Sequence, residues 1–411
     1  MKKQITILLL ILTTASYLYA QDAPCNDDLI MKTIGKWYRP KANPYVPPDK
    51  TNFTKTQQLA IAARMEEMYK MMLKAIPGPM GLDGGWSYRN YDVAFASKVK
   101  YVTTEDGRVQ MAFVKENRLS CYESIWSFWD FNCYTGKFGR GYPGDPNAGI
   151  YVTVNNFGAL LNEAFNNDYT LIDGRTIHRK QTVQGSWKGY DLMWEGGPGR
   201  ELHHDRYILI HRKGELPYIP VTRKQYLDRA FIYLNKFYDN RIKGVDLMPV
   251  RSLEEQETLK KKSLDEYQNK YGSDPKKLKS AVDYYLSSYQ TDQQRRDDQK
   301  NKIIKEKNAV LKHYQDALEK TIADNMLDSA AIVFVAPFGP SDIAPVFSTE
   351  EEGGTMLVTE NPGYLRKDLA KDVPQFIVIN WQWGTSIADE TLRKLFEKNF
   401  EVEKLQAMID K

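Results

Sequence analysis

The segment from residue 252 to residue 328 is rich in charged, helix-forming residues, and it limits how the rest of the chain can be organised. The stretch TDQQRRDDQKNK, at 291–302, has no apolar residue, so a helix there has no face to bury. We expect a solvated tip or a break at this stretch. The heptad pattern of apolar residues in the segment is not continuous, so a long coiled coil is not expected. The segment predicts a charged helical hairpin or small bundle inserted between two other parts of the chain.

Strand patterns dominate on both sides of this insertion. Residues 54–245 begin with a helix over about 54–76, continue through strands between 86 and 212, and end in a helix that starts after Thr222. We expect both helices to pack on the sheet. For residues 330–411, the pattern leaves open whether they form a small layer of their own or complete the first sheet. The expected fold class is α+β: an antiparallel or mixed sheet with packed helices, the charged insertion, and a C-terminal α/β piece.

The first 20 residues have the pattern of a secretory signal peptide. Lys2 and Lys3 precede a mostly apolar run, and the sequence around Ala20 suits cleavage after that residue. A retained N-terminal anchor is the alternative. Residues 21–53 follow as an extended, proline-rich lead-in. No later stretch reaches the ~20 apolar residues of a membrane-spanning helix. We therefore expect an exported chain, periplasmic or extracellular, with no transmembrane span after cleavage.

The charge of the chain is nearly balanced. There are 57 basic and 53 acidic residues, and removal of residues 1–20 takes away two lysines and no acid, which leaves a net charge of +2. A nucleic-acid partner requires a concentrated basic surface. Local basic clusters, such as LKKKS at 259–263, alternate with acidic ones and are typical of solvated helix faces. We therefore expect no nucleic-acid partner.

The chain has three cysteines, enough for one disulfide in an exported protein. We predict a bond between Cys121 and Cys133. On one straight strand these residues would lie ~40 Å apart at ~3.3 Å per residue, whereas a disulfide requires Cα atoms within ~7 Å. The prediction therefore requires the chain to reverse between them. A bond from Cys25 to one of the two is the alternative.

The window WEGGPGRELHHDRYILIHR, at 194–212, concentrates glycines, acidic residues and three of the five histidines. His203 and Asp205 would share one face of a strand, and Glu195 would have to fold back across the glycine-rich bend to join them. This set is the candidate catalytic centre of a hydrolase, which a metal could assist. Because no HExxH or paired CxxC motif accompanies it, we assign no metal ligand. The competing interpretation is a polar turn that leads into a strand with apolar residues 207–210.

Two aromatic stretches are candidate ligand-binding surfaces. In residues 121–149, tryptophans precede a glycine-rich basic loop, a combination that suits stacking on sugar rings or binding of an anion. In NWQWG, at 380–384, two tryptophans point to the same side of a strand. The competing interpretation is that these side chains fill the core, because tryptophan is usually largely buried. The candidate binding residues are Trp126, Trp129, Lys137, Arg140, Trp381 and Trp383.

These patterns together favour an exported cell-envelope protein with a binding or assembly role and no catalysis. An envelope protein partner would contact residues 252–328. The first alternative is a secreted hydrolase centred on His203 and Asp205. The second is a glycan-binding module that uses the aromatic stretch 121–149. The sequence identifies no cofactor.

Overall fold

The computed structural model describes most of the chain after residue 25. The described residues are 26–39, 53–94, 99–103, 109–113, 118–133, 135–139, 148–156, 170–194, 204–334 and 345–411. The predicted signal peptide and much of the proline-rich lead-in lie outside these ranges. The lead-in is not extended throughout, because Asn26 caps a short helix, α2 (Asp27–Lys32), through its side chain.

The chain divides into two compact units. The first consists of residues 1–164, 173–219 and 358–411, and the second of residues 165–172 and 220–357. The second unit is therefore an insertion in the first. It contains the predicted charged segment and also the helix that starts after Thr222.

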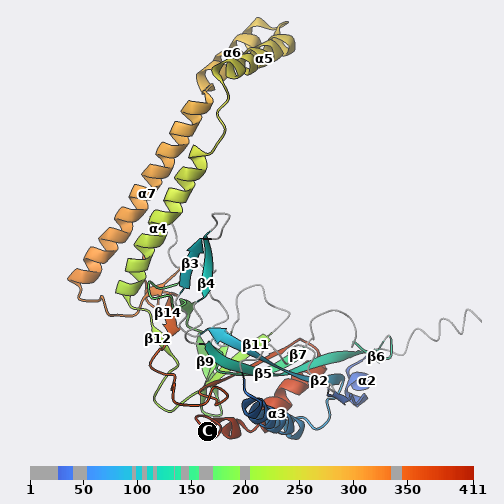
Figure 1. The fold of residues 1–411 in the computed structure, drawn as a ribbon. Coiled ribbons are helices and arrows are strands. Elements are labelled where there is room, and N and C mark those ends of the chain that lie inside the picture. Colours follow the sequence, from blue (N-terminus) through green and yellow to red (C-terminus); the bar gives the residue numbers. More distant parts are fainter. Residues whose placement is uncertain are drawn as a thin grey trace, which may run out of the picture. The chain divides into compact units, whose positions relative to one another are not determined.

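The first unit is built on a nine-stranded, mostly antiparallel sheet (Figure 1). Its order is β1 (Trp37–Tyr38), β2 (Leu82–Ala94), β5 (Arg118–Asn132), β7 (Ala148–Val154), β15 (Ile377–Trp383), β11 (His204–Ile210), β10 (Tyr190–Trp194) and β9 (Val183–Trp187), with β6 (Lys137–Phe138) paired to β5. Only β1 pairs in parallel, with β2. Strand β15 lies between β7 and β11, so the C-terminal residues complete the first sheet.

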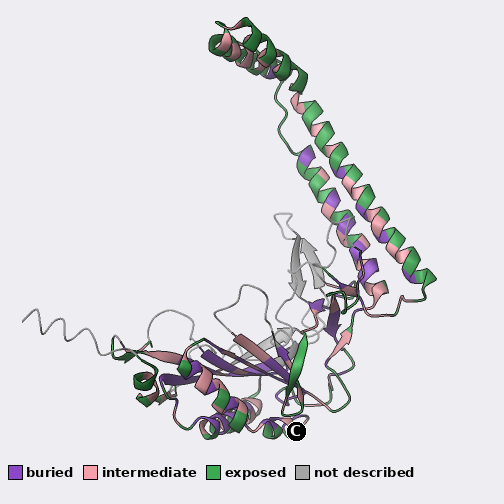
Figure 2. Ribbon diagram, turned by 180° about the vertical axis from the view of Figure 1, so that it is seen from behind, coloured by how far each residue is buried: buried purple, intermediate pink, exposed green. Residues whose placement is uncertain are grey.

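Helices cover the sheet of the first unit. They are α3 (Lys55–Ala75), α8 (Ile387–Asn399) and α9 (Val402–Gln406). The capping box of Thr54 and Gln57 starts α3, and a buried methionine stripe that includes Met65 and Met68 faces the core. Figure 2 shows the buried residues concentrated on the strands and on the covered faces of these helices. The α+β fold class is confirmed.

The second unit contains two long helices that lie side by side, α4 (Arg223–Asp246) and α7 (Asp292–Ala323) (Figure 1). They run antiparallel, because Lys307 pairs with Asp239 at 2.8 Å and Lys300 with Asp246 at 3.1 Å. The buried seam consists of Tyr226, Leu227, Ala230, Leu234, Tyr238 and Val245 on α4 and Ile303, Val310, Tyr314 and Thr321 on α7. We expected α4 to pack on the sheet; its apolar face instead packs on α7.

Two shorter helices, α5 (Leu253–Tyr271) and α6 (Pro275–Ser288), join α4 to α7 and lie beyond their ends (Figure 1). The polar stretch 291–302 is not a break. It forms the exposed first turns of α7 after the capping residue Thr291. Arg296 attaches this stretch to the neighbouring helix, because its guanidinium donates to the carbonyls of Val245, Asp246 and Met248 at the end of α4.

The remaining described strands are short. They are β3 (Val99–Thr103) and β4 (Val109–Phe113), which form a hairpin, together with β8 (His178–Arg179), β12 (Tyr218–Pro220), β13 (Ile332–Val333) and β14 (Thr355–Glu360). Within the described residues, every helix is too short or too polar to cross a lipid bilayer.

Replacement of Leu234 by alanine should loosen the α4–α7 pair. Leu234 is 0 % exposed in the seam, and removal of such a side chain typically lowers the free energy of unfolding by about 2–5 kcal/mol. Hydrogen exchange with mass spectrometry should show faster exchange in peptides of both helices. Ile232→Ala on the same helix is the control, because Ile232 is 49 % exposed and its loss should leave exchange near the wild-type rate. Equal effects of the two variants on exchange would contradict the packing of Leu234 between α4 and α7.

Candidate functional site

Two candidate stretches that lie far apart in the sequence meet on neighbouring strands. Strand β11 comes from the histidine-rich window and β15 from NWQWG, and they pair so that His204 lies opposite Trp383 and Asp205 opposite Gln382. The ring centroids of His204 and Trp383 are 5.3 Å apart. His203 and Glu195, the other proposed catalytic residues, lie outside the described residues.

A cavity of about 310 Å³ opens beside these strands. It is lined by Gln184, Leu192, His204, Arg206, Trp383, Glu390 and Arg393. Asp205 follows His204 on the strand, so its side chain points to the opposite face of the sheet. The structure therefore brings together His204 and Trp383 at this cavity, and it separates Asp205 from them.

Ion pairs tie helix α8 to the sheet around this cavity. Glu397 accepts hydrogen bonds from Arg206 at 2.6 Å, from Arg393 at 2.9 Å and from the Trp381 indole at 3.0 Å. Glu390 accepts hydrogen bonds from the Trp383 indole at 2.9 Å and from Arg393 at 2.7 Å.

These contacts commit the acidic groups to a structural role. Burial tends to raise the pKa of Glu390, but its hydrogen bonds to Arg393 and Trp383 outweigh burial and hold that pKa below its usual range. A carboxylate held ionised between an arginine and an indole is a poor general acid. The ion pairs around this cavity therefore serve to attach α8 to the sheet and do not form a catalytic centre.

The predicted aromatic surfaces do not assemble into one exposed platform. Trp126, Trp381 and Trp383 are buried in the core of the first unit. Trp129 is half-buried and lies an odd number of residues from Trp126 on β5, so the two indoles face opposite sides of the sheet. Lys137 is exposed on β6, and Arg140 lies outside the described residues.

The predicted Cys121–Cys133 disulfide is wrong. Cys121 is a buried free thiol, and its Sγ donates to the carbonyl of Asn155 at 3.0 Å. The reason is geometric: β5 runs without reversal from Arg118 to Asn132, so the chain does not bring the two cysteines together. The alternative bond involves Cys25, which lies outside the described residues.

A second, larger cavity of about 550 Å³ lies in the same unit, at the other end of β11. Its polar lining includes Tyr190, Asp191, His211, Lys213, Tyr218 and Glu403. The sequence window pointed to only one of these, His211. The others come from β10, from the turn after β11, from β12 and from α9, and no motif in the sequence links these segments.

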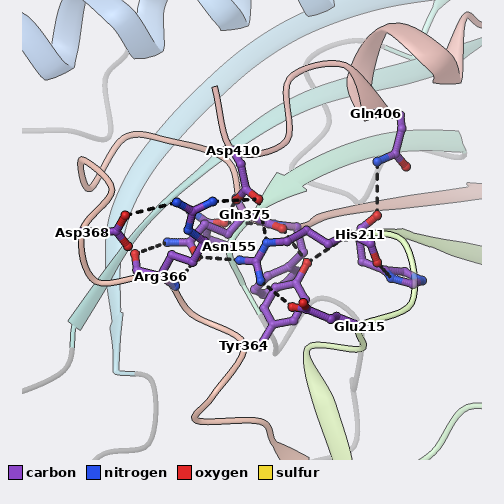
Figure 3. Close-up of polar contacts among 11 residues, drawn as sticks. Asn155, His211, Glu215, Tyr364, Arg366, Asp368, Gln375, Gln406 and Asp410 are labelled. Carbon is purple, nitrogen blue, oxygen red and sulfur yellow. Dashed lines mark hydrogen bonds and ion pairs between the residues drawn. The ribbon is translucent and has the colours of Figure 1, made fainter.

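A polar network fixes the wall of this cavity (Figure 3). The Arg212 guanidinium donates to Asp410 at 2.7 Å, to Glu215 at 2.9 Å and to the Gln375 side chain at 3.0 Å. Its carbon lies 4.1 Å from the centroid of the Tyr364 ring. Burial raises the pKa of Tyr364 to about 12, so its hydroxyl remains a donor, to the Gln375 carbonyl at 2.7 Å. Arg212 thereby holds the backbone of His211 and Lys213 in place.

Comparisons with known proteins give no relative from which to infer a function. No known family, curated protein or solved structure matches the chain. Within the described residues, no group of histidine, cysteine, aspartate and glutamate side chains is arranged to hold a metal ion. Any function must therefore be argued from the geometry.

A pair of acidic residues links the start of α8 to strand β5. Asp389 is 1 % exposed, and its carboxyl group shares a hydrogen bond with Asp130 of β5. Burial and the charge of Asp130 raise the pKa of Asp389 to about 7, against hydrogen bonds from Ser386 and the backbone of Gly384. Because Asp389 is inaccessible to solvent, the pair affects stability rather than catalysis.

The pair makes stability depend on pH. An unfolded aspartate has a pKa of about 3.9, so the folded state binds this proton more tightly. The stability contributed by protonated Asp389 is therefore full below about pH 4 and is lost as the pH rises through about 7. Asp389→Asn removes the titration, so the melting temperature of the variant relative to wild type should rise between about pH 5 and pH 8. The control is Asp28→Asn, at an exposed position, which should show no such trend. If the melting temperature of Asp389→Asn differed from that of wild type by the same amount at every pH, the proposed interaction between Asp389 and Asp130 would be contradicted.

Proposed function

We propose that this chain is an exported protein of the cell envelope with a binding or assembly role, in which the helices of residues 252–328 contact a partner protein. The observation that carries the proposal is the composition of α5 and α6. Among the residues of these two helices, Gln256 is the only buried side chain. The N-terminal signal pattern supports the export part of the proposal.

The α5–α6 pair is poor in internal packing. Contacts between the helices come from tyrosine rings, with centroids of Tyr267 and Tyr285 5.7 Å apart. Helices of this length gain most of their stability from burial of an apolar face, and no apolar side chain of this pair is fully buried. Some apolar side chains of the pair, such as Leu264 and Val282, are half-buried. Others remain on its surface: Leu253 and Tyr284 are each 75 % exposed, and Leu259 and Leu286 are also exposed. A partner that covers these side chains would add to the burial.

A lysine-rich stretch within the pair bears on the partner's chemistry. Between residues 260 and 279 there are seven lysines and three acidic residues, a local net charge of +4, whereas residues 253–288 as a whole have seven basic and seven acidic residues and no net charge. A protein surface rich in aspartate and glutamate would complement the lysine-rich stretch and would speed association at low salt. The proposed partner is therefore a protein with an acidic surface and an apolar centre.

Specific side-chain contacts hold the joint between the α5–α6 pair and the α4–α7 pair. The Arg251 guanidinium and Asp292 form a bidentate pair with two contacts of 2.7 Å. The Gln256 side chain donates to the Arg251 carbonyl at 2.7 Å and accepts from the Asp292 backbone at 2.8 Å. A rigid joint lowers the entropy lost when a partner binds.

The two alternatives have less support. The hydrolase hypothesis depends on Asp205 together with His203 and Glu195, and the last two lie outside the described residues. The glycan-binding hypothesis for residues 121–149 depends on indoles, and that of Trp126 is buried.

Removal of the exposed apolar side chains should abolish partner binding. The variant combines Leu253→Ser, Tyr284→Ser and Leu286→Ser in the full-length protein, expressed in its native host and recovered after cross-linking. We expect loss of a stoichiometric partner that has an acidic surface, with unchanged helix content by circular dichroism. The matched control is Ile34→Ser with Leu59→Ser, which removes exposed apolar side chains from the first unit. Retention of the partner by the α5–α6 variant, or its loss in the control, would contradict the proposal.

A further inference from the structure

The larger cavity of the first unit has the size and lining of a small-molecule site. Its volume, about 550 Å³, falls within the ~300–1,000 Å³ range of such sites. The buried side chains of Met193 and Leu209 contribute an apolar surface, and polar groups surround it. This combination suits a ligand with both apolar and hydrogen-bonding surfaces.

Several polar groups of the cavity are available to a ligand. Within the described residues, the side chains of Asp191, Lys213, Tyr218 and Glu403 have no hydrogen-bond or ion-pair partner. The His211 Nδ1 atom lies 2.7 Å from the Arg212 carbonyl, so in the neutral ring it carries the proton and Nε2 is an acceptor. The cavity thus offers three acceptors, one ammonium donor and one hydroxyl.

The walls of the cavity are held before any ligand binds. Gln406 of α9 donates to the His211 carbonyl at the end of β11 at 3.2 Å (Figure 3). It also accepts from the hydroxyl of Tyr190 on β10 at 3.1 Å, so it links two strands. The Lys188 ammonium donates to the Phe400 carbonyl at 2.6 Å, which fixes the β9–β10 turn to the end of α8. A site with fixed walls loses little entropy on binding.

The charges of the cavity balance. Its lining has two carboxylates, Asp191 and Glu403, and two ammonium groups, Lys188 and Lys213, so neither an anion nor a cation gains a net attraction. Each carboxylate lies near a tyrosine: Asp191 near Tyr218 and Glu403 near Tyr190. A tyrosine ring can pack on the C–H face of a sugar while a carboxylate accepts hydrogen bonds from the sugar's hydroxyl groups. We propose that this cavity binds a neutral mono- or disaccharide, independently of the partner surface on α5 and α6.

Binding of defined sugars tests the proposal. The probes are maltose, cellobiose and N,N′-diacetylchitobiose, with glucuronate and glucosamine as charged comparators, measured on the full chain by saturation-transfer NMR and calorimetry. We expect at least one neutral disaccharide to bind, and Asp191→Asn and Glu403→Gln each to weaken its binding about tenfold or more, because a hydrogen bond to a charged group is lost. Tyr218→Phe should weaken it as well.

Glu254→Gln, at an exposed position on α5, is the matched control and should leave the affinity unchanged. All four variants alter side chains that are not in the core, so an unchanged melting temperature shows that each is folded. Absence of binding by every neutral probe, preference for a charged comparator, or wild-type affinity in Asp191→Asn and Glu403→Gln would each overturn the proposal. None of these outcomes depends on whether α5 and α6 bind a partner.

Discussion

The first unit depends on one buried side chain, that of Asn155, which fixes where the central strand β15 begins. Its side-chain oxygen accepts from the backbone of Gln375 at 2.7 Å and of Phe376 at 3.3 Å, and its amide donates to the Val373 carbonyl at 3.0 Å. The residue has a positive φ of 56°, a conformation that asparagine tolerates better than most residues. A shift of β15 by one position would turn every side chain of that strand to the wrong face.

This register matters because β15 reaches the sheet only after a long excursion. Residues 220–357, which belong to the second unit, lie between β11 and β15 in the sequence. The first and last residues of this segment lie next to each other, because the Val221 amide donates to the Leu357 carbonyl at 2.9 Å. An insertion whose ends lie together can be accommodated without separating the strands on either side. The pairing of β11 with β15 therefore survives the insertion.

Local signals in the sequence predicted where helices begin better than they predicted which elements or residues contact one another. The helices that begin at Thr54 and Thr222 are present as predicted, because each start depends on a capping box between residues three positions apart. The apolar face of α4 was also predicted, but a helix face does not specify whether a sheet or another helix covers it. The predicted disulfide between Cys121 and Cys133 was wrong because the spacing of the two residues does not reveal that one unbroken strand separates them. The larger cavity was missed because distant segments form it without a shared motif.

A continuous set of hydrogen bonds connects Asn155 in the core to the wall of the larger cavity. Asn155 positions Gln375; the Gln375 side chain then accepts from Arg212, and Arg212 fixes the segment that carries His211 and Lys213 (Figure 3). The α5–α6 surface relies on a different arrangement, in which Gln256 and Arg296 bond to backbone groups near the ends of other helices. Buried or half-buried polar groups thus set the geometry in both units. Apolar burial stabilises each unit, but it does not direct a side chain toward one ligand, and directional hydrogen bonds do.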